Sequence, residues 1–193
     1  MQTIDALLER RSAKTLSDPA PDGGALELLL ECAARAPDHG RLRPWRFIVI
    51  RGMARERLGE LMADQLRRKL PDASAETLQR ERQKALRAPL IIVVAAVCKA
   101  EAKVPAIEQV LAAGAAAQNI MLAAPALGFG AMWKTGDAAY DDTVKEALGL
   151  AAADAIVGFL YLGTAPAEGA PPPVRTQWQD RVSFWEIDAG PKA

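Results

Sequence analysis

The longest segment dense in apolar residues is the stretch 104–130. It opens with Pro105 at a position suited to the first turn of a helix, and few polar side chains interrupt it between Ile107 and Leu127. A helix without a polar face lies in a core or an interface, because no side is left for water. The stretch is therefore predicted to be the central helix, shared with a second subunit, and to kink or end at Pro125.

Other segments follow shorter patterns. Two continuous apolar runs, 89–98 and 156–163, predict strands buried on both faces, and aromatic and branched residues predict a third strand over 45–51. Further elements are expected as helices at 4–10, 24–36, 54–69, 74–86 and 137–148 and as strands at 129–133 and 182–188. Helices and strands are mixed without regular alternation, which predicts an α+β fold.

The length of the chain suits one domain spanning residues 1–193, in which 165–193 form an extended C-terminal arm. This arm is rich in proline and leads to the expected strand at 182–188. A strand that leaves its own domain is predicted to pair with the sheet of another subunit.

Composition narrows the functional classes. The 24 Lys and Arg residues balance the 24 Asp and Glu residues, which argues against a general nucleic-acid or membrane-surface binder. The first residues lack the order of a signal peptide, and no apolar run is long enough for a membrane span, so a cytoplasmic protein is expected. Cys32 and Cys98 are expected as reduced packing residues, and with one histidine they form no recognisable metal site.

A short basic segment follows the first predicted helix and contains Arg10, Arg11, Ser12 and Lys14. Guanidinium groups and a hydroxyl that converge can bind a phosphate. Basic residues are also common where a helix ends in solvent, since cations are favourable there. Spacing alone favours the solvated helix end.

The loop 35–46 places Asp38 beside His39, which allows either acid–base chemistry or a solvated histidine. A triad of these two residues with Ser12 is disfavoured, because no G-x-S-x-G turn presents the serine. In the arm, Arg175 and Arg181 could reach a ligand phosphate or keep the arm soluble, and both readings stay open.

The segment G-F-G-A-M-W-K-T at 128–135 resembles a phosphate loop, but Trp133 replaces the second glycine. A bulky indole there prevents the backbone from wrapping around a phosphate, so the segment does not indicate a nucleoside triphosphatase. The segment instead predicts a strand end at which Lys134 and Thr135 line a pocket. The indole is expected in the core or stacked on a planar ligand.

Seven motifs, taken in order, resemble the FMN-dependent nitroreductase family over nearly the whole chain. They are R-R-S at 10–12, R-A-P-D-H at 35–39, P-W-x-F at 44–47, A-P-L-I-I from 88, L-G-F-G from 127, W-[KR]-[ST]-G from 133 and V-G-F-L-Y-L-G-T from 157. The resemblance implies a nitroreductase-like fold with a mixed, mainly antiparallel central sheet flanked by helices. It also implies an intertwined homodimer with C-terminal arm exchange and FMN sites at the interface.

The resemblance further assigns roles to individual residues. It implies that Arg10, Arg11 and Ser12 hold the phosphate and ribityl chain of FMN, with Lys14 near the pyrimidine edge of the flavin. Arg35 and His39 would reach the FMN bound mainly by the other subunit. The remaining implied contacts are those of Trp133, Lys134 and Thr135 with FMN, and those of Ala123, Ala124, Pro125, Ala126, Leu127 and Gly128 with NAD(P).

The activity implied is an NAD(P)H-dependent oxidoreductase. Hydride would pass through flavin N5 to a flat electrophilic acceptor, a nitroaromatic, quinone or similar compound, by a ping-pong mechanism without a catalytic side chain. The alternative is a flavin-binding carrier or sensor without turnover. The chain departs from the family pattern in two segments. Leu42 and Arg43 precede P-W where longer relatives carry N-x-Q, and Pro125 interrupts the nucleotide segment.

Overall fold

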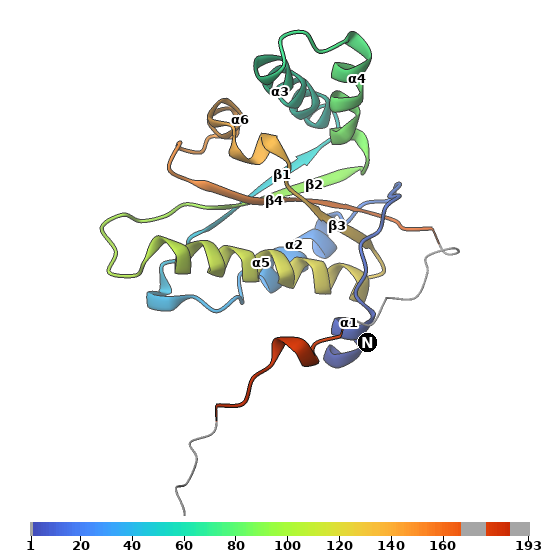
Figure 1. Cartoon of the computed structure of the whole chain (residues 1–193). Coiled ribbons are helices and arrows are strands. Elements are labelled where there is room, and N and C mark those ends of the chain that lie inside the picture. Colours follow the sequence, from blue (N-terminus) through green and yellow to red (C-terminus); the bar gives the residue numbers. More distant parts are fainter. Residues whose placement is uncertain (1, 167–176, 186–193) are drawn as a thin grey trace, which may run out of the picture.

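A four-stranded sheet forms the centre of the molecule in this computed structural model, which describes residues 2–166 and 177–185 (Figure 1). The described strands pair antiparallel throughout, as the expected mainly antiparallel sheet requires, and their order is β1-β2-β4-β3. Helices cover both faces, which confirms the α+β class. The strands are β1 (Trp45–Arg51), β2 (Leu90–Ala96), β3 (Gly130–Lys134) and β4 (Ala155–Gly163).

Strand β2 is the most deeply buried of the four, because every one of its residues is shielded from solvent. Ile92 and Val94 join one apolar cluster, whereas Ile91 and Val93 join the cluster on the opposite face. Alternate residues of a strand point to opposite faces, so a continuous apolar run serves two cores at once. The prediction of a strand buried on both sides is confirmed.

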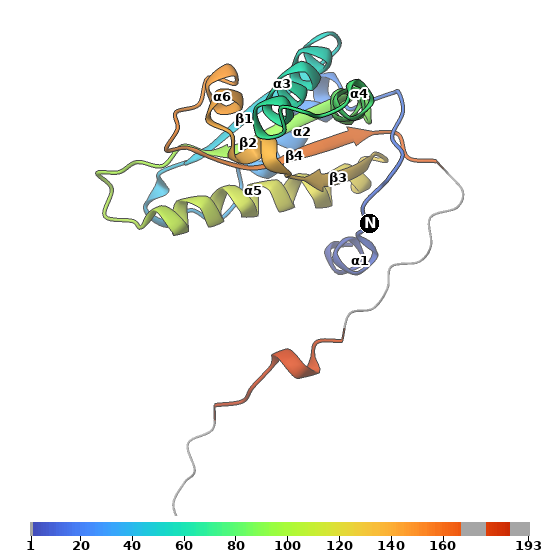
Figure 2. The same cartoon turned by 45° about the horizontal axis from the view of Figure 1, so that its top comes forward.

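One face of the sheet is covered by α5 (Ala106–Ala126) and α2 (Gly23–Ala33), which pack against each other. The Asn119 amide donates to the Cys32 carbonyl at 2.9 Å and so ties the two helices together. The short helix α1 (Thr3–Glu9) lies at the C-terminal end of α5 (Figure 2). Helix α5 ends one residue after Pro125, as predicted.

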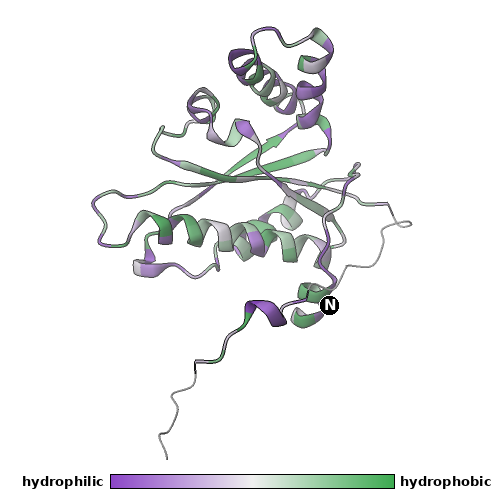
Figure 3. Cartoon of the chain, in the orientation of Figure 1, coloured by the Kyte–Doolittle hydropathy of each residue, from purple (hydrophilic) through white to green (hydrophobic). Residues whose placement is uncertain are grey.

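The other face carries more polar helices, which Figure 3 shows in purple, whereas the strands and much of α5 are green. Helices α3 and α4 approach closely at Gly59, where an added Cβ would lie 2.6 Å from the Arg82 carbonyl oxygen. These elements are α3 (Ala54–Lys69), α4 (Ala75–Gln83), α6 (Asp142–Ala147) and the short 3-10 turns η2 (Lys84–Leu86) and η3 (Asp137–Tyr140).

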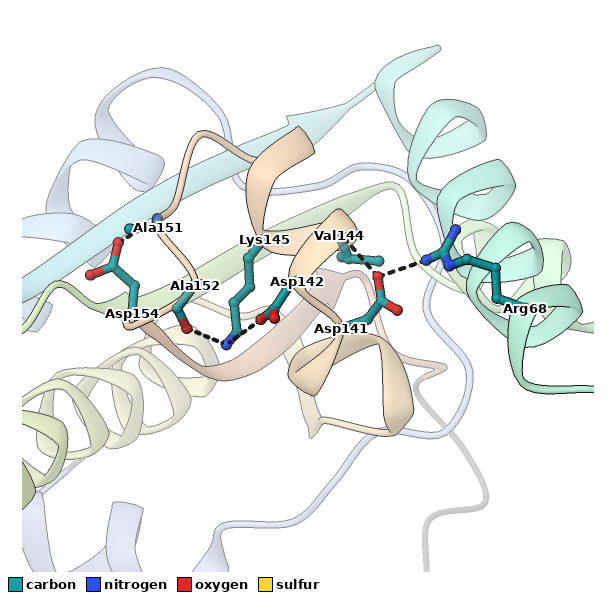
Figure 4. A network of polar contacts seen from close by, with 8 residues as sticks. All are labelled: Arg68, Asp141, Asp142, Val144, Lys145, Ala151, Ala152 and Asp154. Atoms are coloured by element: carbon teal, nitrogen blue, oxygen red, sulfur yellow. Dashed lines mark hydrogen bonds and ion pairs between the residues drawn. The ribbon is translucent and has the colours of Figure 1, made fainter.

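The single helix predicted over 137–148 is wrong, because Asp141 divides it into η3 and α6. The Asp141 carboxylate accepts hydrogen bonds from the Val144 N–H at 3.0 Å and from Arg68 at 2.7 Å (Figure 4). An aspartate in extended conformation whose oxygen accepts an N–H three residues on starts a new helix. Partial burial raises the pKa of Asp141, but the bonds from Arg68 and the backbone outweigh it and lower the pKa overall.

The same segment contains a second set of polar contacts that closes the turn before β4. Lys145 donates to the Ala152 carbonyl at 2.8 Å and lies 3.3 Å from the Asp142 carboxylate. Asp154 accepts the N–H of Ala151 at 2.8 Å (Figure 4). These contacts tie α6 to the turn that precedes β4.

The remaining elements are short. A 3-10 turn, η1 (His39–Arg41), follows α2, and η4 (Gln179–Arg181) lies in the arm. Residues 182–185 are not in a strand, and the rest of the predicted strand at 182–188 lies outside the described residues, as does Arg175. In the part of the chain that the structure describes, no helix has the length and apolar character needed to cross a bilayer.

Candidate functional site

The basic segment after α1 lies along the outer edge of β3, although more than a hundred residues separate the two. The Ala13 N–H donates to the Ala131 carbonyl at 2.9 Å, and Ser17 forms an antiparallel bridge with Thr164. Gly130 makes this approach possible, since an added Cβ would lie 2.7 Å from the Leu16 side chain. The structure thus brings the R-R-S segment to the strand that carries the W-K-T-G segment.

A hollow of about 560 Å³, which we name the basic hollow, opens between α1, the end of α5 and the start of β3. Arg10 and Arg11 contribute two positive charges and Glu9 one negative charge. Pro125 and Phe129 contribute an apolar wall, and Gly128 lies in the turn beside it. Residues predicted for FMN and for NAD(P) therefore meet in one cavity. Its full lining is Ala6, Glu9, Arg10, Arg11, Ala13, Pro125, Gly128, Phe129, Gly130, Ala131, Ala165 and Pro166.

The other residues of these two predicted sets differ in exposure. Ser12 and Lys14 are exposed beside the basic hollow without lining it. Ala124 is fully buried in the last turn of α5, so its side chain is part of the core. Ala123 and Leu127 are half-buried and Ala126 is exposed.

Trp133 and Lys134 lie on opposite faces of the sheet. The Trp133 indole packs on the α5 face, and its Nε1–H donates to the Val157 carbonyl at 3.2 Å. It occupies the space above Gly158, where an added Cβ would lie 2.1 Å from Nε1. This tryptophan is therefore half-buried in the core around β4, which was one of the two expectations for it.

Lys134 and Thr135 line a second cavity of about 310 Å³ behind the sheet, which we name the α3 hollow. Its other polar lining residues are Gln65 of α3, Glu81 of α4, Lys84 of η2, Arg87 just after η2, Asp137 of η3 and Tyr161 of β4. The nine residues predicted for FMN are thus distributed among the basic hollow, the α3 hollow, the core and the far end of the molecule.

His39 lies at that far end. Its Nδ1 is 2.6 Å from a carboxylate oxygen of Glu108 in the first turn of α5. Glu108 and Pro125 are 17 residues apart in this helix, which at 1.5 Å per residue is about 26 Å. One FMN cannot touch both His39 and the basic hollow of the same subunit. Arg35 is exposed just beyond α2.

The histidine has no catalytic partner in its own loop. The Asp38 carboxylate accepts the Arg43 N–H at 2.6 Å, and the imidazole pairs with Glu108 instead. Among the described residues, no group of three or more His, Cys, Asp or Glu side chains is placed to hold a metal. Cys32 and Cys98 are both free thiols, and partial burial, with a smaller contribution from Asp154, raises the pKa of Cys98.

The model of the Nitroreductase family matches residues 7–164 of the chain. The chain belongs to the nitroreductase family. This confirms the resemblance drawn from the seven motifs, and with it the expected class of protein, an oxidoreductase.

Individual relatives of this nitroreductase support the same assignment. It is 42% identical over 164 residues to the Escherichia coli (strain K12) protein named "Putative NAD(P)H nitroreductase YdjA", with 85% of this chain and 88% of that protein covered. A nitroreductase-like family protein from Bacillus cereus has a similar fold, with a TM-score of 0.82, 26% identity and 97% of each chain covered. A Desulfovibrio desulfuricans "putative nitroreductase in complex with FMN" gives a TM-score of 0.72 at 26% identity, over 95% of this chain and 96% of that one.

Sequence reasoning missed the residues that this nitroreductase places in the α3 hollow. Tyr161 lies in the apolar run of β4, and Gln65 lies in a helix that resembles a charged surface helix. The only sequence signal is a single polar residue at a position whose neighbours on the same face are apolar. That signal is weak, because a buried tyrosine is common in cores.

The close approach of Trp133 to Gly158 can be tested by a double-mutant cycle. We expect Gly158→Ala to destabilise the protein by about 1–3 kcal/mol, because the new methyl group overlaps the indole. In a Trp133→Ala background, Gly158→Ala should lower the free energy of unfolding by only a small fraction of that amount, because the indole is absent. Urea denaturation of the four proteins measures both values, and equal costs in the two backgrounds would contradict the contact. Gly24→Ala, where an added Cβ meets open space, is the matched control.

Proposed function

We propose that this member of the nitroreductase family is an FMN-dependent oxidoreductase that uses NAD(P)H in the cytoplasm. The observation that carries the proposal is the basic hollow, in which Arg10 and Arg11 face the turn that follows α5. Two guanidinium groups beside an exposed Ser12 hydroxyl match the charge and donors that a nucleotide phosphate requires. The apolar wall formed by Pro125 and Phe129 suits a flat ring.

Bound FMN would supply the redox chemistry itself, by taking hydride from NAD(P)H at N5 and passing it to a nitroaromatic, quinone or similar acceptor in a ping-pong sequence. The protein would therefore need only to bind, orient and shield. Arg10, Arg11 and Ser12 would hold the phosphate and ribityl chain. Lys14 would lie by the pyrimidine edge, where a cation stabilises developing negative charge.

The segment 123–128 would contact the nicotinamide nucleotide. Ala124 faces the core, so contacts there would come from backbone atoms and from the more exposed Ala126 and Gly128. Gly128 has φ +85°, a conformation that L side chains rarely adopt, which allows the chain to turn directly from α5 toward β3. Lys134 and Thr135 would approach the flavin from the end of the same strand.

The distance between His39 and the basic hollow supports a homodimer. The exposed face of α5 carries Ile107 and Leu111, each 63% exposed, and an added Cβ at Gly114 would meet open space. A second copy that crosses this face in the opposite direction would cover both side chains and bring its own His39 and Arg35 toward the basic hollow. FMN would then be bound between the two subunits, and the C-terminal arms would exchange.

The proposal predicts a flavin that is reduced by nicotinamide nucleotides. The purified protein should be yellow, and NADH or NADPH added without oxygen should bleach its absorption near 450 nm. A flavin spectrum that does not bleach would indicate a carrier or sensor without turnover. A colourless protein that takes up no added FMN would contradict the proposal.

The phosphate assignment predicts that Arg10→Ala weakens FMN binding by about 10- to 100-fold, since one charge-assisted hydrogen bond is lost. Equilibrium dialysis or flavin fluorescence measures the dissociation constant. Arg80→Ala is the control, because Arg80 is exposed on α4 and pairs only with Glu76 in the described part of the chain. Equal affinity in the Arg10 and Arg80 variants would exclude the basic hollow as the phosphate site.

The dimer predicts that Leu111→Lys yields monomers with lower FMN content, because a buried charge in the interface is costly and Arg10 alone cannot complete the site. Sedimentation velocity and flavin absorbance measure the two effects. The matched control is Leu70→Lys, since Leu70 is similarly exposed at the end of α3, away from α5. A Leu111→Lys protein that remains dimeric would show that the subunits meet elsewhere.

A further inference from the structure

The α3 hollow contains two buried polar side chains whose hydrogen-bonding groups have no protein partner. Gln65 is 8% exposed and Tyr161 is 3% exposed, and both line the cavity. Within residues 2–166 and 177–185, neither the amide nor the phenol makes a side-chain hydrogen bond. The polar atoms of both side chains are accessible from the cavity, so the amide and the phenol are available to a ligand that binds in the hollow.

The charges around the hollow are unequal once its internal ion pairs are formed. Glu81 pairs with Lys84, and Asp137 pairs with Lys69 at 2.6 Å, so both carboxylates on the wall have cations of their own. Arg87 and Lys134 also line the cavity, and no carboxylate in the described part of the chain forms an ion pair with them. The charge that these ion pairs leave unneutralised in the hollow is therefore positive.

The phenol is a hydrogen-bond donor at neutral pH. Burial raises the pKa of Tyr161 to about 12, although the nearby charge of Arg87 acts in the opposite direction and Glu81 adds to the rise. A protonated phenol, a side-chain amide, a guanidinium and an ammonium can all donate hydrogen bonds. Four donors of this kind around one cavity favour a ligand that presents several acceptor oxygens.

We propose that the α3 hollow binds a small oxyanion, a carboxylate or phosphate group, that accepts hydrogen bonds from Gln65, Tyr161, Arg87 and Lys134. The guanidinium of Arg87 and the ammonium of Lys134 supply the charge, and the two buried neutral groups supply direction. The volume of about 310 Å³ accommodates such a group together with the small molecule that carries it.

The anion has two possible sources. It is either a free inorganic anion or an acidic substituent of the acceptor, because Lys134 and Thr135 belong both to this hollow and to the proposed FMN contacts. The first source does not depend on the proposed function, whereas the second rests on it. The experiments are therefore separated into a binding test, which needs no turnover, and a kinetic test.

The binding test uses the fact that the chain has only two tyrosines, Tyr140 and Tyr161. Full-length protein labelled with ¹³C at the tyrosine Cζ gives two NMR signals, which Tyr140→Phe assigns. Sodium phosphate or sodium benzoate is added at constant ionic strength. We expect the Tyr161 signal to shift saturably, while the signal of Tyr140, which is exposed on η3, stays in place.

Two variants establish which side chains are responsible. Arg87→Gln should raise the dissociation constant of the anion that shifts the Tyr161 signal by about tenfold or more, because a charged donor is lost. Arg80→Gln removes a similarly exposed arginine from α4 and should leave the titration unchanged. The absence of a saturable shift with either anion, or equal shifts of both tyrosines, would overturn the proposal.

The kinetic test compares 4-nitrobenzoate with uncharged nitrobenzene as acceptors. If the acceptor carries the anion, Arg87→Gln and Tyr161→Phe should each raise KM for 4-nitrobenzoate several-fold and leave KM for nitrobenzene unchanged. If both acceptors are unaffected while phosphate still shifts Tyr161, the ligand is a free anion. A protein without turnover would contradict the proposed function, but the NMR titration would still decide whether the hollow is an anion site.

Discussion

The architecture of this nitroreductase depends on a helix that has two apolar sides. The sheet covers one side of α5, where Ala113, Ala117 and Ile120 are fully buried against β2 and β4. The other side leaves Ile107 and Leu111 in solvent, and full burial of such a side chain is worth about 1.5–3 kcal/mol. The same helix separates the His39 end from the basic hollow by more than 20 Å, as its rise per residue requires. Uncovered apolar surface and an incomplete ligand site are therefore two consequences of one helix, and a second subunit would resolve both.

Strand β3 places its predicted site residues on both faces of the sheet. It lies at the edge, so one side is free to receive the basic segment, to which Ala13 is joined through the Ala131 carbonyl. Its alternating side chains send Trp133 toward α5 and Lys134 toward α3. Gly158 on β4 gives the indole its place, and Gly130 allows Leu16 to approach. The absence of a side chain at these two glycines is what lets distant segments come together around β3.

The sequence predicted most of the fold because most elements have strong local patterns. Strand β1 and helix α3 begin and end where their patterns predict, and β2 is buried as its apolar run requires. The prediction of one helix over 137–148 was wrong, because the spacing of Val144 and Leu148 gives no sign that Asp141 caps a new helix. Asp141 competes for the backbone N–H groups, and its bond to Arg68 of α3 adds a tertiary contact that periodicity cannot reveal. Similarly, the motifs identified Arg10, Arg11 and Lys134 as a set. They did not reveal that Lys134 of β3 lines a different cavity from the two arginines.

The α3 hollow shows why such sites escape sequence analysis. Gln65 and Tyr161 come from a helix and a strand almost a hundred residues apart, and each is an ordinary residue in its own segment. What distinguishes them is a missing partner, which only the packing of α3 and α4 over the sheet creates. The polar atoms of both side chains open onto the cavity, where water or a ligand can hydrogen-bond to them. Two accessible donors beside two cations form a set that favours an anionic ligand, and no single segment of the sequence contains that set.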